Sequence, residues 1–189
     1  MRVISGKYKG HKLVSFQAGH IRPTTDRVKE TLFNKLMGLT GDARVLDLFS
    51  GTGNLGIEAI SREAAHVDFV EENRKSLSIL RENLNKLHIT SGFTVYPLDV
   101  FKYLKRHDGE PYNLILADPP FTQKFADLVM ETIAASKVLQ PGTVVAIESS
   151  AQETIRDAYA AADSKCDLNL LDRKNFGDKS LSLFQAGVT

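Results

Sequence analysis

The sequence predicts an α/β fold of the Rossmann-like kind, in which a mostly parallel sheet lies between two layers of helices. After residue 40, short β-branched runs alternate with segments whose apolar residues recur every three or four positions, as strands joined by crossover helices do. The first run, 44–49, ends in a glycine-rich turn that opens a helix. The last two runs, 167–171 and 180–184, are separated by about eight polar residues. That is too few for a helical crossover, so we expect an antiparallel pair there.

The elements between these ends follow from the same periodicities. Leu77, Leu80, Leu84 and Leu87 are spaced by three and four residues, so they should share one face of a helix. We expect further strands at 66–71, 93–96, 112–117 and 143–148, and further helices after the glycine turn, at 101–106 and at 124–137.

The first 40 residues lie outside this alternation. Two short apolar runs, 3–5 and 12–14, flank a segment that begins and ends with glycine and predict a small β-hairpin. A helix should begin near Asp26, and its apolar stripe comprises Val28, Leu32, Leu36 and Leu39. We therefore divide the chain into a basic N-terminal arm, residues 1–25, and one α/β domain, residues 26–189.

The charge of the chain is unevenly distributed. The whole sequence has a net charge of +1, yet residues 1–37 hold eight basic and two acidic residues, a net charge of +6, which leaves −5 for the other 152 residues. A basic arm on an acidic body is typical of a segment that contacts a polyanion such as nucleic acid, although a solvated lysine-rich edge would have the same composition. The candidate contacts are Lys7, Lys9, Lys12, Arg22 and Arg27.

The composition argues against several classes of protein. The single cysteine, Cys166, allows neither an internal disulfide nor a multi-cysteine zinc site, so we expect no metal and a reducing, cytoplasmic setting. No apolar run approaches the roughly 18 residues that a membrane-spanning helix needs. The basic N-terminus lacks the apolar core of a signal peptide. With 42% hydrophobic residues in 189 positions, the chain suits one folded domain.

A glycine-rich loop marks a candidate cofactor site. Residues 51–56 match the pattern G-x-G-x-x-G between a strand and a helix, where glycines let a ligand approach the backbone and the helix N-terminus favours negative charge. Glu71 follows 20 residues after Gly51, at the end of the next strand, where a carboxylate accepts both hydroxyls of an adenosine ribose. The pattern fits a dinucleotide, S-adenosylmethionine or a purely structural turn.

Two further carboxylates favour S-adenosylmethionine over a dinucleotide. Asp47 lies inside the end of the first strand, where it either orients the loop or meets the cofactor's ammonium group, whereas a pyrophosphate would gain nothing from it. Asp99 follows the third strand, where it either accepts from an adenine amino group or caps the next helix. The candidate cofactor contacts are Asp47, Phe49, Ser50, Gly51, Thr52, Gly53, Glu71, Asp99 and Val100.

The tetrad Asp118-Pro119-Pro120-Phe121 follows a buried strand, at the edge of the sheet where open α/β folds bind ligands. An aromatic exocyclic amine is a poor nucleophile because its lone pair is delocalised into the ring. The Asp118 carboxylate and the Pro119 carbonyl are two acceptors that would draw the nitrogen toward a tetrahedral shape, and consecutive prolines hold them rigid. Phe121 offers a flat face on which a base can stack.

The tetrad therefore predicts methyl transfer to the amino group of a nucleic-acid base, and it leaves adenine, cytosine and guanine open. The alternative is a proline turn with Phe121 packed as ordinary core.

The sequence resembles the bacterial small-subunit ribosomal RNA guanine-N2 methyltransferases over nearly its whole length. The opening, 2–13, the segment 22–34 and the loop 47–56 look like motifs of that family. The tetrad completes the set, and the segment 22–34 is the most diagnostic. The resemblance implies a class I methyltransferase fold, with a seven-stranded, mostly parallel sheet that closes in an antiparallel hairpin. It also implies S-adenosylmethionine as methyl donor and a guanine in 16S ribosomal RNA as acceptor, in a ribosomal particle or assembly intermediate and not in free RNA.

The family's functional positions carry over to this chain by motif. The tetrad would hold the target base, while Asp47, the loop at Gly51, Glu71 and Asp99 would hold the cofactor. The segment 22–27 would cover the methionine end of the cofactor or the RNA. Within it Thr24 and Thr25 offer hydroxyls, and Arg22 and Arg27 can pair with a carboxylate or phosphate. The alternative for this segment is the entry to a helix whose N-cap is Asp26. The C-terminal part resembles the family less closely, since Phe184 lies where the family leads us to expect a tyrosine.

Three other functions are compatible with parts of the pattern. A DNA methyltransferase acting on adenine N6 or cytosine N4 would have the same tetrad, but the chain has no room for a separate target-recognition domain, so we expect no DNA partner. A nicotinamide-dependent oxidoreductase would use the glycine loop, but neither His66 nor His88 lies at the carboxyl end of a predicted strand. A non-catalytic RNA-binding factor would not need Asp118 and Phe121 together. We expect a monomer.

Overall fold

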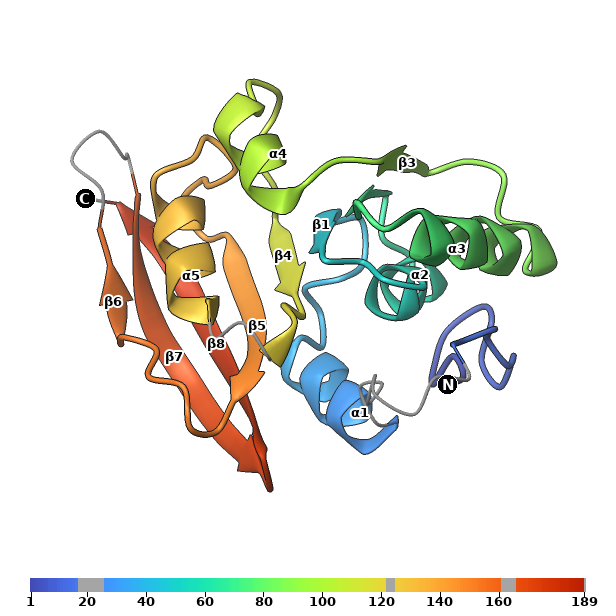
Figure 1. Ribbon diagram of the computed structural model, residues 1–189, viewed down its shortest axis with the longest axis horizontal. Helices are drawn as coiled ribbons and strands as arrows, with labels where there is room; N and C mark the ends of the chain where they lie inside the picture. The colour runs from blue at the N-terminus through green and yellow to red at the C-terminus, as the bar shows by residue number, and fades with distance from the viewer. Residues whose placement is uncertain (17–25, 122–124, 161–165, 189) are drawn as a thin grey trace.

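The computed structural model describes residues 1–16, 26–121, 125–160 and 166–188, and it contains one eight-stranded sheet (Figure 1). The strands in chain order are β1 (Arg44–Leu48), β2 (His66–Val70), β3 (Phe93–Tyr96), β4 (Leu114–Ala117), β5 (Val144–Ser150), β6 (Ala158–Tyr159), β7 (Cys166–Phe176) and β8 (Lys179–Val188). The helices in the described residues are α1 (Asp26–Lys35), α2 (Asn54–Ser61), α3 (Arg74–Lys86), α4 (Val100–Arg106) and α5 (Ala126–Ala134).

The order of the strands across the sheet is β3-β2-β1-β4-β5-β8-β7-β6. Strands β1 to β5 pair in parallel, and β8, β7 and β6 pair antiparallel. The predicted sheet, parallel with an antiparallel closing hairpin, is therefore confirmed. The sheet has eight strands where seven were expected, because Ala158 and Tyr159 pair with Asn169 and Leu168 along the outer side of β7.

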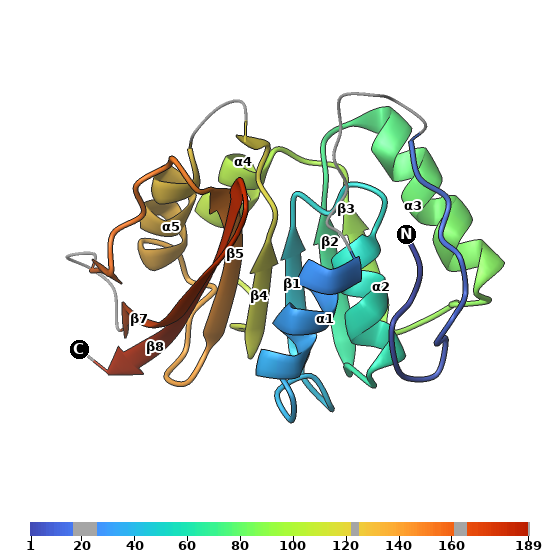
Figure 2. The same ribbon diagram turned by 90° about the horizontal axis from the view of Figure 1, so that it is seen from below.

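Two apolar layers lie on opposite faces of the sheet. Helices α1, α2 and α3 cover one face, and α4 and α5 cover the other (Figure 2). The leucine face predicted for α3 is confirmed, since Leu77, Leu80 and Leu84 are buried. The helix begins at an N-cap, Asn73, whose side chain accepts from two backbone N–H groups of the first turn. Burial of each such leucine stabilises the fold by about 1.5–3 kcal/mol.

The C-terminal hairpin is tighter than the sequence predicts. Residues 172–176 were expected in a polar loop, yet they continue β7, and the turn to β8 consists of Gly177 and Asp178 alone. Gly177 has a φ of +65°, which suits the first position of a two-residue hairpin turn. Polar side chains are tolerated in this part of β7 because most of them are exposed. A bulge between Leu170 and Asp172 leaves Leu171 56% exposed.

A second difference concerns the end of the first helix. The apolar stripe was expected to include Leu39, but α1 ends at Lys35 and Leu39 is 44% exposed. Val28, Leu32 and Leu36 are buried as expected. Gly38, with a φ of +85°, reverses the chain after the helix.

The N-terminal segment forms a compact reversal that packs on α2 and α3. Arg2 and Lys12 form an antiparallel bridge, and Val3 N–H donates to the carbonyl of His11 at 3.0 Å. Val3 and Leu13 are buried in the same apolar layer as α1 to α3. The predicted hairpin is present as a single bridge and not as two regular strands. Among the described residues, no helix is both long and apolar enough to cross a membrane.

A buried carboxylate ties this N-terminal segment to α2. Glu58 accepts from the backbone N–H groups of Ile4 and Ser5 at 2.8 and 3.0 Å and from Arg62 Nε at 2.9 Å. Lys29 Nζ lies 3.3 Å from Glu58 Oε2, and both side chains are at most 1% exposed. Burial lowers the pKa of Lys29 from its ordinary value, and the Glu58 carboxylate opposes that shift.

Replacing Glu58→Ala should therefore destabilise the protein by about 3–5 kcal/mol, because it leaves Lys29 as a buried charge without its counter-ion. Urea unfolding measures this loss. The matched control is Glu82→Ala on the exposed side of α3, which should change stability by less than about 0.5 kcal/mol. Equal midpoints for the two variants would contradict the structural role of Glu58.

Candidate active site

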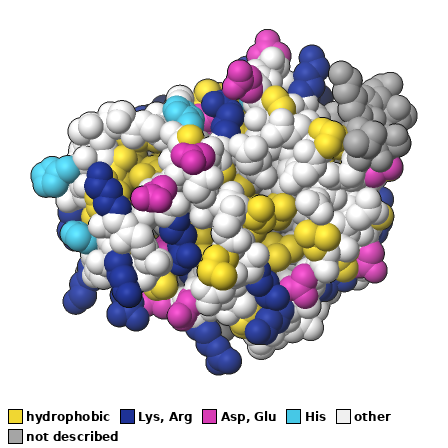
Figure 3. Space-filling model, turned by 180° about the vertical axis from the view of Figure 1, so that it is seen from behind, with side chains coloured by type: hydrophobic (Ala, Val, Ile, Leu, Met, Phe, Trp, Pro, Cys, Tyr) yellow, Lys and Arg dark blue, Asp and Glu magenta, His cyan; other side chains and the backbone are white. Residues whose placement is uncertain are grey.

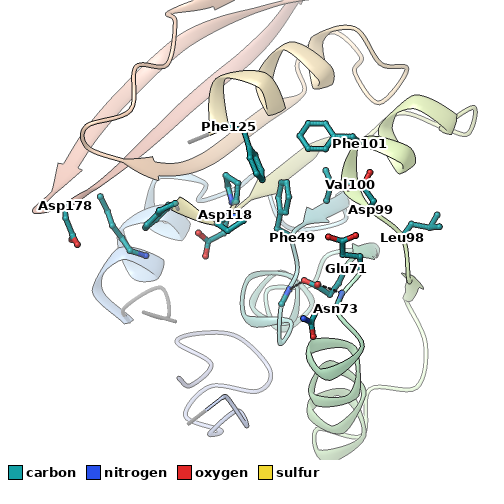
Figure 4. A pocket seen from close by; sticks show the side chains of 16 residues that line it. Phe49, Glu71, Asn73, Leu98, Asp99, Val100, Phe101, Asp118, Phe125 and Asp178 are labelled. Carbon is teal, nitrogen blue, oxygen red and sulfur yellow. Dashed lines mark hydrogen bonds between the residues drawn. The ribbon is translucent and has the colours of Figure 1, made fainter. Parts of the chain in front are cut away.

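A cavity of about 960 Å³ opens at the carboxyl ends of the parallel strands. Its walls come from the loops that follow β1, β2 and β4, from the start of α4, and from the tip of the β7–β8 hairpin (Figure 4). This is the edge at which open α/β sheets bind ligands. The described lining residues are Phe49, Gly51, Glu71, Glu72, Asn73, Leu98, Asp99, Val100, Phe101, Asp118, Pro119, Pro120, Phe121, Phe125, Asp178 and Lys179.

All four tetrad residues lie at this cavity. β4 ends at Ala117, and the Asp118 N–H still points toward the carbonyl of Leu48 in β1, at 3.5 Å. The tetrad therefore begins where the parallel pairing of β4 with β1 ends. Pro119 is buried, while Pro120 is exposed at the rim. Figure 4 shows Asp118, Phe49 and Glu71 around the same space, although they come from three different loops.

The glycine loop is held in place by side chains from neighbouring strands. Gly51 N–H donates to Glu71 Oε2 at 2.8 Å, and Gly56 N–H donates to Asp47 Oδ2 at 2.9 Å. Gly53 N–H donates to the carbonyl of Ser50 at 2.8 Å. All three glycine amides of the motif are thus engaged within the protein, so none is directed at an anionic ligand.

Two of these glycines are required by packing. Gly53 has a φ of +86°, and a Cβ there would lie 2.3 Å from a methyl carbon of Leu80. A Cβ on Gly56 would lie 2.3 Å from the ring of Phe69 and 2.8 Å from Asp47 Oδ2. The motif therefore brings α2 close to the sheet as well as leaving room at the cavity.

The structure divides the predicted cofactor residues into two groups. Phe49, Gly51, Glu71, Asp99 and Val100 line the cavity. Ser50, Thr52 and Gly53 lie behind the loop and support it. Ser50 Oγ donates to the carbonyl of Asp47 at 2.6 Å, and the carbonyl of Thr52, a buried residue, accepts from Asn83. Gly53 packs on Leu80. Thr24, Thr25 and Arg22 fall outside the described residues.

Asp47 orients the loop, which is one of the two roles that the sequence left open. It is 1% exposed, and its carboxylate faces Gly56. Burial raises the pKa of Asp47 to about 8, and the negative charges of Asp118 and Glu71 add to that shift, while the Gly56 N–H opposes it. Asp99 is the N-cap of α4, since it accepts from Lys102 N–H at 2.9 Å, and it also lines the cavity. Its contact with an adenine amino group stays a prediction.

Several lining residues were missed by the sequence analysis. Phe125 lies 6.0 Å from Phe49 and 5.7 Å from Phe101, ring centre to ring centre, and the three rings form an apolar wall. Lys179 and Asp178 reach the cavity from the hairpin tip. The predicted antiparallel direction of β8 could have indicated these two residues, because it places the beginning of that strand at the carboxyl edge of the sheet.

The basic residues of the N-terminal segment are exposed and lie apart from the lining residues. Lys7, Lys9 and Lys12 are all exposed on the reversal that packs on α2 and α3, and Arg27 is exposed in the first turn of α1. Lys7 Nζ lies 5.4 Å from the centre of the Tyr8 ring. In Figure 3, which shows the back of Figure 1, Lys and Arg side chains gather along the lower rim on the α3 side.

The pKa of Asp47 has a measurable consequence for stability. The pKa of Asp47 in the folded protein, about 8, is above the ordinary value of 3.8. Its contribution to the free energy of unfolding is therefore most favourable at low pH and is lost as the pH rises toward 8. Asp47→Asn keeps an acceptor for Gly56 N–H but cannot ionise. The stability of the variant relative to the wild type should therefore rise between pH 5 and 8, by at most about 1.4 kcal/mol per pH unit.

Urea unfolding across this pH range measures the difference, with Asp42→Asn, at an exposed position, as the control. Parallel pH profiles for Asp47→Asn and the wild type would show that the Asp47 carboxyl titrates normally.

Comparisons with known proteins agree with this geometry. The family model described as Conserved hypothetical protein 95 matches residues 1–185. Two proteins named Ribosomal RNA small subunit methyltransferase D are each 34% identical to the chain: that of Haemophilus influenzae covers 79% of this chain and 78% of its own length, and that of Escherichia coli covers 80% and 76%.

Solved structures show the same fold. The structure titled as the putative methyltransferase yhhF from Escherichia coli superposes with a TM-score of 0.85 at 31% identity, over 100% of this chain and 99% of the other. A putative methyltransferase, SMU.776, whose title states a complex with SAH, has the same fold at 17% identity, with a TM-score of 0.64 over 84% of this chain and 48% of its own. The fold is thus that of the class I methyltransferases, and the chain belongs to the Conserved hypothetical protein 95 family, which is the family of the small-subunit ribosomal RNA methyltransferases D.

Proposed function

We propose that this protein transfers a methyl group from S-adenosylmethionine to the exocyclic N2 amine of a guanine in 16S ribosomal RNA, within the small ribosomal subunit or a precursor of it. The observation that carries the proposal is the position of Asp118-Pro119-Pro120-Phe121 on the wall of the same cavity as the glycine loop. The names of the relatives support a ribosomal RNA substrate. The guanine N2 position rests on the resemblance of the sequence motifs.

The charge of the cavity supports S-adenosylmethionine over a dinucleotide. Five of the described lining side chains are carboxylates, and one, Lys179, is basic; the acidic ones are Glu71, Glu72, Asp99, Asp118 and Asp178. A sulfonium and an ammonium group are attracted to such a wall, whereas a pyrophosphate is repelled. The engaged amides of Gly51, Gly53 and Gly56 also favour S-adenosylmethionine, because a pyrophosphate site needs such amides directed at the ligand.

Each part of the cavity has a distinct task in this reaction. Glu71 would accept from the ribose hydroxyls of the cofactor, and Asp99 lies at the start of α4 where it would meet the adenine. Phe49, Phe101 and Phe125 form an apolar wall, which would limit the access of water to the methyl group. The bound cofactor would supply an electrophilic methyl group carried on a positively charged sulfur.

The tetrad would prepare the acceptor. The Asp118 carboxylate and the Pro119 carbonyl would accept the two N–H bonds of the target amine, so that its lone pair is directed at the methyl carbon. The bond from the nitrogen to the methyl carbon would form as the bond from that carbon to the cofactor's sulfur breaks. The Asp118 carboxylate would stabilise the cationic nitrogen until one of its protons leaves to solvent. Phe121 would stack on the base. Two prolines make the aim of the acceptors rigid, because their φ angles are fixed.

The first test separates cofactor binding from catalysis. By calorimetry the wild type should bind S-adenosylmethionine and show no appreciable affinity for NAD. Asp118→Ala should retain that binding but lower the rate of methyl transfer by about 100-fold or more, because it removes an acceptor that acts in the transition state.

The matched control is Asp178→Ala, which removes a carboxylate from the same cavity but outside the tetrad, and which should leave most of the activity. Binding of NAD in place of S-adenosylmethionine, or a wild-type rate in Asp118→Ala, would contradict the proposal.

The second test concerns the delivery of the RNA. Reversing three charges, Lys7→Glu, Lys9→Glu and Lys12→Glu, should weaken RNA binding and reduce the slope of log affinity against log salt by about 2–3, since each phosphate contact contributes about 0.7–0.9. Filter binding or fluorescence titration at several salt concentrations measures the slope.

The control reverses three exposed charges on the other face of the sheet: Lys105, Arg106 and Lys137. It should leave the slope near that of the wild type. If both triple variants gave the same slope as the wild type, the N-terminal basic residues would be a solvated edge and not an RNA contact.

A further inference from the structure

Lys179 occupies an unusual position at the candidate active site. It begins β8 and lies opposite Ser150, the last residue of β5. The antiparallel pairing of these strands therefore brings it to the carboxyl edge of the sheet. Its side chain is only 7% exposed, yet it lines the cavity. A lysine is seldom buried to this degree without a specific partner.

Two groups fix the ammonium of Lys179. Its Nζ donates to Glu148 Oε2 at 3.1 Å, and the Glu148 side chain is 2% exposed. The same Nζ lies 4.7 Å from the centre of the Phe121 ring, within the range of a cation–π contact. Across the described residues, Glu148 is the one hydrogen-bond acceptor of this ammonium. A lysine has three N–H donors, and Glu148 takes one of them, so the ammonium can also donate to a ligand in the cavity.

The ammonium of Lys179 is a hydrogen-bond donor, which the proposed amine-binding groups of the tetrad do not provide. The groups proposed to grip the target amine, the Asp118 carboxylate and the Pro119 carbonyl, are both acceptors, and acceptors alone fit the amino group of any base. The described lining contains five carboxylates and no basic side chain other than Lys179. The strongest donor in the cavity is therefore next to Phe121, the proposed stacking surface.

The arrangement of polar groups on the bases gives that donor a role. Along its Watson–Crick edge, guanine presents the N2 amine, then N1–H, then the acceptor O6. Adenine held by its own amine presents N6, then N1, then a C2–H that cannot accept a hydrogen bond. Cytosine presents an acceptor, N3, in the middle of the edge, where it would face the Asp118 carboxylate unfavourably.

We propose that Lys179 is a specificity-determining residue that donates a hydrogen bond to O6 of the target guanine, while Glu148 and Phe121 hold its ammonium in position. This inference rests on the proposed function, because it takes a base gripped by its amine at Asp118 as its starting point. It assigns the choice of guanine over adenine to a side chain outside the tetrad.

The test compares two bases in two enzymes. Small-subunit particles are assembled with guanine or with 6-thioguanine at the methylated position, since 6-thioguanine keeps the N2 amine and N1–H and replaces O6 by a weakly accepting sulfur. The wild type should lose about tenfold in kcat/KM on 6-thioguanine, the effect of weakening one charged hydrogen bond. Lys179→Met should lose at least as much on guanine and show little further loss on 6-thioguanine.

A second variant guards against misfolding, because Lys179→Met leaves Glu148 as a buried charge. The double variant Glu148→Gln with Lys179→Met removes both charges, and it should bind S-adenosylmethionine like the wild type and again fail to distinguish the two bases. Equal sensitivity to 6-thioguanine in the wild type and in both variants would overturn the inference. Absence of any methyl transfer to guanine by the wild type would instead overturn the proposed function itself.

Discussion

The loop after β1 is held by two carboxylates, and the shape and charge of the cavity depend on them. Asp47, buried in β1, accepts from Gly56, and Glu71, at the end of β2, accepts from Gly51. These bonds draw the loop and α2 onto the sheet and engage the amides that a phosphate site would need. Burial raises the pKa of Asp47 to about 8, and the charges of Asp118 and Glu71 add to that shift, so the negative charge at the cavity comes from Glu71 and the other lining carboxylates. The engaged amides and the lining carboxylates therefore favour the cationic cofactor that we propose over the dinucleotide that the glycine pattern alone would also fit.

The same helix connects the cavity to the N-terminal segment. Glu58 of α2 binds the backbone of Ile4 and Ser5, while Lys29 of α1 donates to Asn54, the first residue of α2. The exposed lysines of the N-terminal segment are therefore fixed relative to the glycine loop, and they are not carried on a free tail. In a methyltransferase acting on a ribosomal particle, this rigidity would set the distance between the contact with the RNA backbone and the base that enters the cavity.

Much of this structure could be predicted from local patterns, and the exceptions have physical reasons. The parallel strands and the leucine face of α3 follow from periodicity, because each element buries one face. The extent of β7 could not be predicted, because the polar residues 172–176 pair with β8 and yet remain largely exposed. The tetrad was recognised because its chemistry lies in consecutive residues. Lys179 was missed because its place beside Phe121 depends on the register between β5 and β8.

The measurement that tests the proposed reaction most directly is mass-spectrometric mapping of methylated nucleotides. Undermethylated small-subunit particles and free 16S RNA are incubated in parallel with the protein and isotopically labelled S-adenosylmethionine. We expect one labelled N2-methylguanosine in the RNA from the particles and little or none in the free RNA. Label on an adenine N6 or a cytosine N4, or no label in either substrate, would contradict the assignment of this cavity to guanine N2 methylation.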